Sequence, residues 1–156
     1  GGGEMIKEVT FEHTTYNDLP FKYEAGTPDI EGAIAMAAAI DYMNTIGMEK
    51  IAAHESYLEQ KTTAALKEIN GIKLYGTAPQ KAAVVSFRIE GIHHYDLGTL
   101  LDQMGVAVRT GHHCCQPLMA RYGITGTVRA SFAAYNTEQE VDAFIEALHK
   151  ASRMLS

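Results

Sequence analysis

The chain has 156 residues, of which 46% are hydrophobic and 21% are charged, and its formal net charge is −6. This length and composition suit about one globular domain with a buried core. The negative charge gives no electrostatic case for nucleic acid or an anionic membrane, no apolar run approaches the ~20 residues of a membrane span, and the N-terminus lacks the order of a signal peptide. We therefore expect a cytoplasmic protein that binds neither nucleic acid nor membrane.

The first part of the chain is expected to contain one short strand and two long helices. Residues 4–10 alternate weakly and favour a strand, and the polar stretch that follows, to position 20, favours a loop. An Ala-rich helix is predicted over residues 28–46, with Thr27 as its N-cap. A second helix is predicted over residues 48–69, where apolar residues recur at spacings of three and four.

The rest of the chain alternates strands with helices. The expected strands are residues 72–76, 83–89, 106–109 and 127–132, and the expected helices are residues 95–104, 116–122 and a final one capped by Thr137 and Glu140. Turn residues between the first two strands indicate an antiparallel pair. No repeat or linker interrupts the pattern, so we expect one compact α/β unit over residues 28–156, preceded by a less packed arm of residues 1–27.

Residues 109–117 hold both cysteines of the chain, together with cationic and imidazole side chains. A thiol reacts as the thiolate, which nearby cations and helix N-termini favour. Arg109 and the histidines at 112 and 113 supply such charge, and Gln116 is the expected N-cap of the next helix. A disulfide between adjacent cysteines would be strained, so Cys114 is either a reactive thiol or a small buried residue.

A zinc site is a second interpretation of the same loop. Two histidines and two cysteines are suitable ligands, but four consecutive residues cannot surround one tetrahedral ion, whose ligands come in spaced pairs. The other histidines of the chain form no recognisable ligand pair with this loop. We therefore expect no metal.

Two further positions suggest that the protein binds anions. Gly26 and Thr27 precede a helix start, which is either a structural cap or a phosphate site, although the acidic residues at 29 and 31 weaken the second possibility. Arg129 lies between apolar residues in a predicted strand and needs a carboxylate or phosphate partner, from the protein itself or from a substrate.

Three segments are specific enough to indicate a family. Residues 109–114 (Arg-Thr-Gly-His-His-Cys), 116–119 (Gln-Pro-Leu-Met) and 128–137 closely resemble the C-terminal part of SUF-type cysteine desulfurases and selenocysteine lyases, which are pyridoxal-phosphate enzymes of the class V aminotransferase family. Residues 21–30 and 1–6 are also similar to that family, so the resemblance covers essentially the whole chain.

The resemblance implies a fold as well. It implies the small C-terminal α/β domain of a fold-type I pyridoxal-phosphate enzyme, with a mostly antiparallel small sheet, helices packed on one side of it and two long N-terminal helices. The arm of residues 1–27 would then be the end of a preceding large domain.

The resemblance also implies an activity and roles for residues. Such an enzyme takes sulfur from L-cysteine, or selenium from selenocysteine, leaves alanine, and passes the sulfur from a persulfide to an acceptor protein for iron–sulfur cluster assembly. By motif position Cys114 would be the nucleophile, Arg129 the clamp for the substrate carboxylate and Arg109 a second active-site cation. Gly26 and Thr27 would contact the phosphate of pyridoxal phosphate across a homodimer interface.

The chain departs from the family pattern at three points. Cys115 stands where the family usually has a small residue, and His94-Tyr95 replaces a common Pro-His pair. No lysine lies in the Ser-x-His-Lys context that holds the cofactor as a Schiff base. We therefore expect this polypeptide alone not to desulfurate cysteine.

Two alternative functions remain. A stand-alone sulfur-carrier or thiol-redox module would accept persulfide on Cys114 without any cofactor. A lyase or transaminase of the same class is the other alternative, but those reactions need no nucleophilic thiol, so the Gly-His-His-Cys string argues against it.

Overall fold

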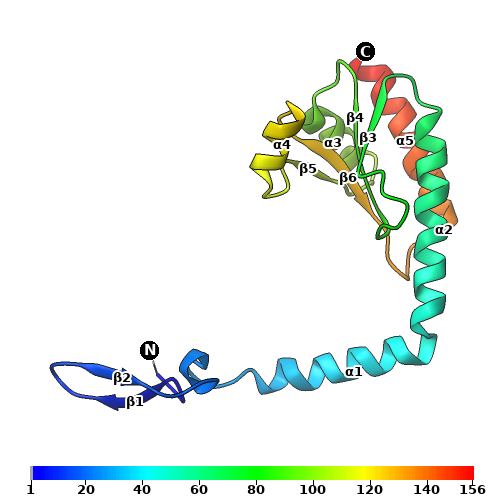
Figure 1. Cartoon of the computed structure of the whole chain (residues 1–156). Helices are drawn as coiled ribbons and strands as arrows, with labels where there is room; N and C mark the ends of the chain where they lie inside the picture. The colour runs from blue at the N-terminus through cyan, green and yellow to red at the C-terminus, as the bar shows by residue number, and fades with distance from the viewer. Residues whose placement is uncertain (1) are drawn as a thin grey trace. The chain divides into compact units, whose positions relative to one another are not determined.

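The computed structural model describes residues 2–156 and divides them into two units that meet at Gly47 and Met48 (Figure 1). Gly1, which belongs to the expected N-terminal arm, lies outside the described residues. None of the helices in the described part of the chain is long and apolar enough to cross a membrane.

The first unit contains a β-hairpin, a short 3-10 helix and one long α-helix. Its elements are β1 (Ile6–Val9), β2 (Thr14–Tyr16), η1 (Phe21–Tyr23) and α1 (Ile30–Ile46). The prediction of a loop after β1 is therefore wrong in part, because β2 lies in this stretch and pairs antiparallel with β1. The three residues of β2 are too few to show a period-two pattern in the sequence.

The N-cap of α1 is Asp29 and not Thr27, so this part of the prediction is wrong. The side chain of Asp29 accepts a hydrogen bond from the amide of Gly32 at 2.8 Å. A carboxylate in this position satisfies a free amide of the first turn and interacts favourably with the positive end of the helix. The helix consequently begins two residues later than expected.

The second unit is a four-stranded sheet with helices. Its elements are α2 (Met48–Lys67), β3 (Ile72–Tyr75), β4 (Val84–Ile89), α3 (His94–Gln103), β5 (Arg109–Gly111), α4 (Gln116–Tyr122), β6 (Thr127–Ser131) and α5 (Glu138–Leu155). The strand order is β3-β4-β6-β5, and all three pairings are antiparallel. This confirms the predicted small antiparallel sheet.

The hydrophobic core lies between one face of this sheet and the helices α2, α3 and α5 (Figure 1). The sheet contributes Val85, Phe87, Ile89, Val128 and Ala130, all less than 9% exposed. Because side chains alternate across a strand, their neighbours Ser86, Arg88 and Arg129 point to the opposite face. We call that second face, which also carries Lys73, Tyr75 and Arg109 by strand register, the open face.

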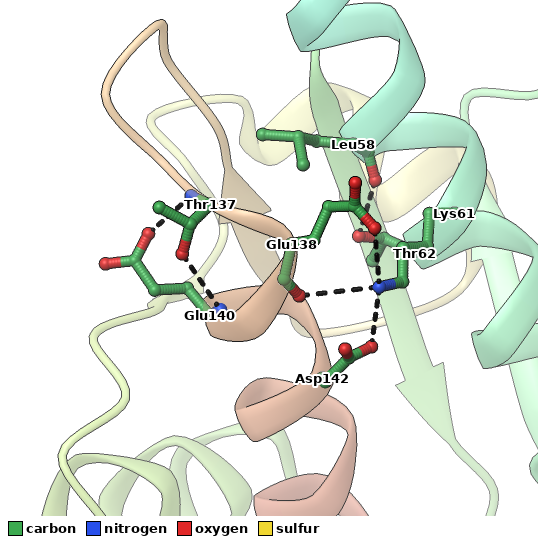
Figure 2. Close-up of polar contacts among 7 residues, drawn as sticks. All are labelled: Leu58, Lys61, Thr62, Thr137, Glu138, Glu140 and Asp142. Atoms are coloured by element: carbon green, nitrogen blue, oxygen red, sulfur yellow. Dashed lines mark hydrogen bonds and ion pairs between the residues drawn. The ribbon is translucent and has the colours of Figure 1, made fainter.

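Polar contacts join the start of α5 to α2 (Figure 2). Thr137 and Glu140 form the predicted capping box: the Thr137 hydroxyl accepts from the Glu140 amide at 3.2 Å, and the Glu140 carboxylate accepts from the Thr137 amide at 2.7 Å. On α2, Lys61 pairs with Glu138 at 3.4 Å and with Asp142 at 2.8 Å. Exposed ion pairs add little stability, so these contacts mainly set how α5 begins beside α2.

The strand predicted over residues 106–109 is misplaced. Pairing begins only at Arg109, and the strand runs to Gly111. Val106 and Val108 pack, partly buried, against the core without entering the ladder. Their apolar pattern therefore reflects packing and not strand pairing.

Candidate active site

Two arginines lie opposite each other on the open face. Arg109 of β5 is the register partner of Arg129 of β6, and Ser86 of β4 is the partner of Arg129 on its other side. Like charges directly opposite each other destabilise a sheet. Within residues 2–156 neither guanidinium forms an ion pair with a carboxylate, and the Nε of Arg129 is buried without a hydrogen-bond partner. The pair is therefore suited to an anionic ligand, which a guanidinium can bind through two parallel hydrogen bonds.

Residues 112–115, the cysteine loop, follow β5 directly and lead into α4. Arg109 Nη2 lies 3.7 Å from Cys114 Sγ, and the Cys114 amide donates to His112 Nδ1 at 3.0 Å. His113 and Cys114 have φ values of 54° and 58°, in the left-handed region that residues other than glycine rarely adopt. Such backbone strain is concentrated at functional sites. The thiols of Cys114 and Cys115 are both free and exposed.

The side chain of His113 is turned toward the sheet. Its Nε2 lies 2.8 Å from the Thr127 hydroxyl of β6. Burial, followed by the charges of Arg129 and Arg109, lowers the pKa of His113 below its ordinary value of 6.5. His113 therefore anchors the loop as a neutral imidazole, and it supplies less positive charge to the thiol than its position in the sequence indicates.

A pocket of about 240 Å³ lies over the open face beside Cys115. Its walls come from β3, β4, β6, the cysteine loop and α4: Tyr75, Gly76, Ser86, His113, Cys115, Leu118, Met119, Tyr122, Thr127 and Arg129. Ser86 is not among the residues predicted for the site, although its alternation with buried Val85 and Phe87 was a usable signal. Tyr75 and Tyr122 were not predicted either, because their rings come together from different elements, with centroids 5.3 Å apart.

Two glycines and a histidine pack tightly at the base of the loop. A Cβ added to buried Gly126 would lie 2.6 Å from the carbonyl carbon of Gly111 and 2.7 Å from His94 Nε2. His94 is only 3% exposed, and its ring stacks on His93. Burial, then the charges of His93 and Arg88, lowers its pKa. The unusual His94 thus closes the base of the segment that carries Cys114.

Gly26 and Thr27 belong to the first unit, whereas Cys114, Arg109 and Arg129 come together in the second. Gly26 has a φ of +80° with open space where a Cβ would lie, but its amide already donates to the Gly2 carbonyl at 3.0 Å. Thr27 is exposed, with a hydroxyl that forms no hydrogen bond to residues 2–156. The group that fits a phosphate here is therefore this free hydroxyl. The N-terminus of α1 itself contributes less to phosphate binding than Thr27, because the Asp29 carboxylate already caps this helix.

No group of three or more His, Cys, Asp or Glu side chains within residues 2–156 is placed to hold a metal ion.

The model of the class V aminotransferase family matches residues 1–144, and the chain belongs to this family. It is 55% identical over 155 residues to a probable cysteine desulfurase of Xylella fastidiosa, and the match covers 99% of this chain and 37% of that protein. It is also 43% identical over 156 residues to a cysteine desulfurase of Dickeya dadantii, with 99% of this chain and 38% of that protein covered.

Two solved structures are similar along almost the whole chain. The cysteine desulfurase CsdA of Escherichia coli, in an S-sulfonic acid form, has a TM-score of 0.87 at 38% identity, covering 100% of this chain and 39% of that one. The apo cysteine desulfurase of Thermococcus onnurineus has a TM-score of 0.85 at 40% identity, covering 99% and 39%. The chain thus spans well under half the length of these relatives and corresponds to their C-terminal portion, which confirms the predicted fold class.

Proposed function

We propose that this chain is the C-terminal part of a pyridoxal-phosphate-dependent cysteine desulfurase. It would take sulfur from L-cysteine, or selenium from selenocysteine, onto Cys114, and deliver it to an acceptor protein for iron–sulfur cluster assembly. The observation that carries the proposal is the exposed Cys114 thiol beside Arg109, next to an Arg109–Arg129 pair that has no carboxylate partner within residues 2–156.

Substrate binding follows from the arginine pair. The α-carboxylate of L-cysteine would accept two parallel hydrogen bonds from the guanidinium of Arg129. Its negative charge would also relieve the repulsion between the guanidinium groups of Arg109 and Arg129. Arg109 is shared between this anion and Cys114 Sγ, so binding orients the substrate beside the thiol. The Thr127–His113 contact holds the loop to the strand that carries Arg129.

Sulfur transfer then takes place at Cys114. Its thiolate, which lies beside the Arg109 guanidinium, attacks the substrate sulfur, so that a sulfur–sulfur bond forms and the carbon–sulfur bond of the substrate breaks. The substrate carbon keeps the electron pair and takes a proton, so L-cysteine and the thiol become L-alanine and a persulfide without any external oxidant. Pyridoxal phosphate, when bound, supplies the electron sink for the carbon–sulfur cleavage.

In this proposal Gly26 and Thr27 contact the cofactor phosphate in a homodimer of the full-length enzyme. Residues 1–27 would belong to the end of the large domain, and residues 28–156 would form the small domain. The chain has no lysine in the expected Schiff-base context, so the chain alone should release no alanine from L-cysteine.

The test is a chimera in which residues 2–156 replace the matching portion of the Xylella fastidiosa relative, to which the chain is 55% identical. The chimera should bind pyridoxal phosphate, release alanine from L-cysteine and carry a persulfide on Cys114. In the chimera, Cys114→Ser should abolish the persulfide and leave the cofactor absorbance intact, whereas Cys115→Ala should retain the persulfide.

Three outcomes would contradict the proposal. Alanine release by the isolated chain with pyridoxal phosphate would refute the need for a further domain. Persulfide retained in Cys114→Ser but lost in Cys115→Ala would move the nucleophile to Cys115. An inactive chimera that binds its cofactor, together with an isolated chain that accepts sulfur from polysulfide on Cys114, would favour the sulfur-carrier alternative.

A further inference from the structure

A second pair of opposed cations lies on the open face, on strands β3 and β4. Lys73 is the register partner of Arg88, so both side chains point to the same face. Neither forms an ion pair within residues 2–156, although Lys61 and Lys81 both have carboxylate partners. The only aromatic contact of Lys73 within these residues is with the Tyr75 ring, whose centroid is 5.7 Å from Nζ. Two unneutralised cations therefore face each other across the ladder.

Arg88 is the member of this pair whose burial costs more free energy. Its Nε is buried and has no hydrogen-bond partner within residues 2–156. A buried donor without a partner costs free energy, and a charged donor costs more than a neutral one. Glu90 lies nearby on the same wall but pairs with neither cation. An external anion would supply the missing acceptor.

The pair borders a pocket in the second unit with a volume of about 570 Å³. This volume lies within the range of pockets that bind small molecules. Besides Lys73 and Arg88, the wall contains the apolar residue Ile124 and the tyrosines Tyr75 and Tyr122. The tyrosine pair also lines the pocket beside Cys115, so the two pockets share one wall.

We propose that Lys73 and Arg88 bind the phosphate or carboxylate group of a small molecule whose aromatic or apolar part packs against Tyr75, Tyr122 and Ile124. The anion accepts hydrogen bonds from the two cations and removes their mutual repulsion. The cavity is larger than an inorganic anion needs, and its remaining wall is aromatic and aliphatic, so the body of the ligand contributes contact area. This inference does not depend on the desulfurase proposal.

The test uses the isolated chain and nuclear magnetic resonance, with the amides of Gly71, Gly91 and Gly123 as reporters because all three line this pocket. Phenyl phosphate and benzoate are the probes that separate a phosphate from a carboxylate preference. Inorganic phosphate tests the head group alone, and benzyl alcohol tests the ring alone. We expect at least one of the two aromatic anions to shift all three reporters and to bind more tightly than inorganic phosphate or benzyl alcohol.

Variants locate the site. Lys73→Gln and Arg88→Gln should each weaken binding about tenfold, as expected for loss of a hydrogen bond to a charged group. Arg88→Lys should lose less than Arg88→Gln. Lys50→Gln, which makes the same charge change on α2 outside the pocket, should leave binding unchanged.

Lys73 is exposed, so its replacement by glutamine should not impair folding. Binding that is unchanged in a folded Lys73→Gln chain would refute the role of the pair. A shift of the Gly111 amide, with the amides of Gly71, Gly91 and Gly123 unchanged, would instead assign the anion to Arg109 and Arg129. No shift with any probe would also refute the site.

Discussion

Replacing Gly126 with alanine tests whether packing at the base of the loop controls the site. The added Cβ would lie 2.6 Å from the Gly111 carbonyl carbon, whereas ordinary contacts begin near 3.4 Å, so the two backbone segments must separate by about 0.8 Å. His94 Nε2 presents a further contact at 2.7 Å. Overpacking of this kind costs ~2–3 kcal/mol, which for a chain of this length lowers the Tm by ~4–12 °C.

The assay combines thermal unfolding with the rate at which Cys114 is alkylated by iodoacetamide, followed by the mass of the labelled peptide. Gly126→Ala should lower the Tm and change the alkylation rate, because Gly111 lies three residues before the thiol. Gly105→Ala is the matched control: Gly105 has a φ of +80° but no atom near its Cβ position, so we expect a loss of only ~1 kcal/mol and an unchanged alkylation rate.

A double variant separates the effects of the two close contacts, one with the Gly111 backbone and one with the His94 ring. Adding His94→Ala to Gly126→Ala removes the imidazole contact but leaves the Gly111 backbone in place, so it should not restore the Tm. If Gly126→Ala unfolds within ~1 °C of the native chain and Cys114 reacts at the native rate, the close packing at Gly111 does not position the loop, and this reasoning fails.

Two further predictions concern stability. Thr137→Ala removes one half of the capping box of α5 and should cost about 1 kcal/mol, seen as a lower urea midpoint at an unchanged m-value; an unchanged midpoint would contradict the role of the cap. The lowered pKa values of His94 and His113 should make the fold less stable in mild acid. Both imidazoles are favoured in the neutral form, so their contribution is complete above the ordinary pKa of 6.5 and is lost as the pH falls through the folded-state values. The urea midpoint should drop as the pH falls below about 6.5, and less steeply in His94→Gln; an equal drop in that variant would exclude His94 as a cause.

Elements with strong local signals were predictable. The capping box at Thr137 and Glu140 and the apolar alternation of residues 84–89 both appear as expected, because each depends on residues close together in the sequence. The prediction was wrong where two residues compete for one role. Thr27 and Asp29 are both good N-cap residues, and the helix uses the one whose side chain reaches the Gly32 amide.

The boundaries of β5 show a second limit. Val106 and Val108 have the apolar pattern of a strand, yet they pack against the core without pairing. Whether such a segment enters a ladder depends on β6, some 20 residues further along the chain. Local sequence carries no record of that register.

The sequence by itself determined the chemistry of the loop: one short segment holds the thiols and a cation, and its motif led to the family that the comparisons confirm. The 3.7 Å contact between Arg109 and Cys114 joins residues only five positions apart. Tertiary structure alone placed Arg129 opposite Arg109, turned His113 toward Thr127 and buried His94 beneath the loop. These arrangements depend on strand register and on packing between distant segments, which arise only when the whole unit folds.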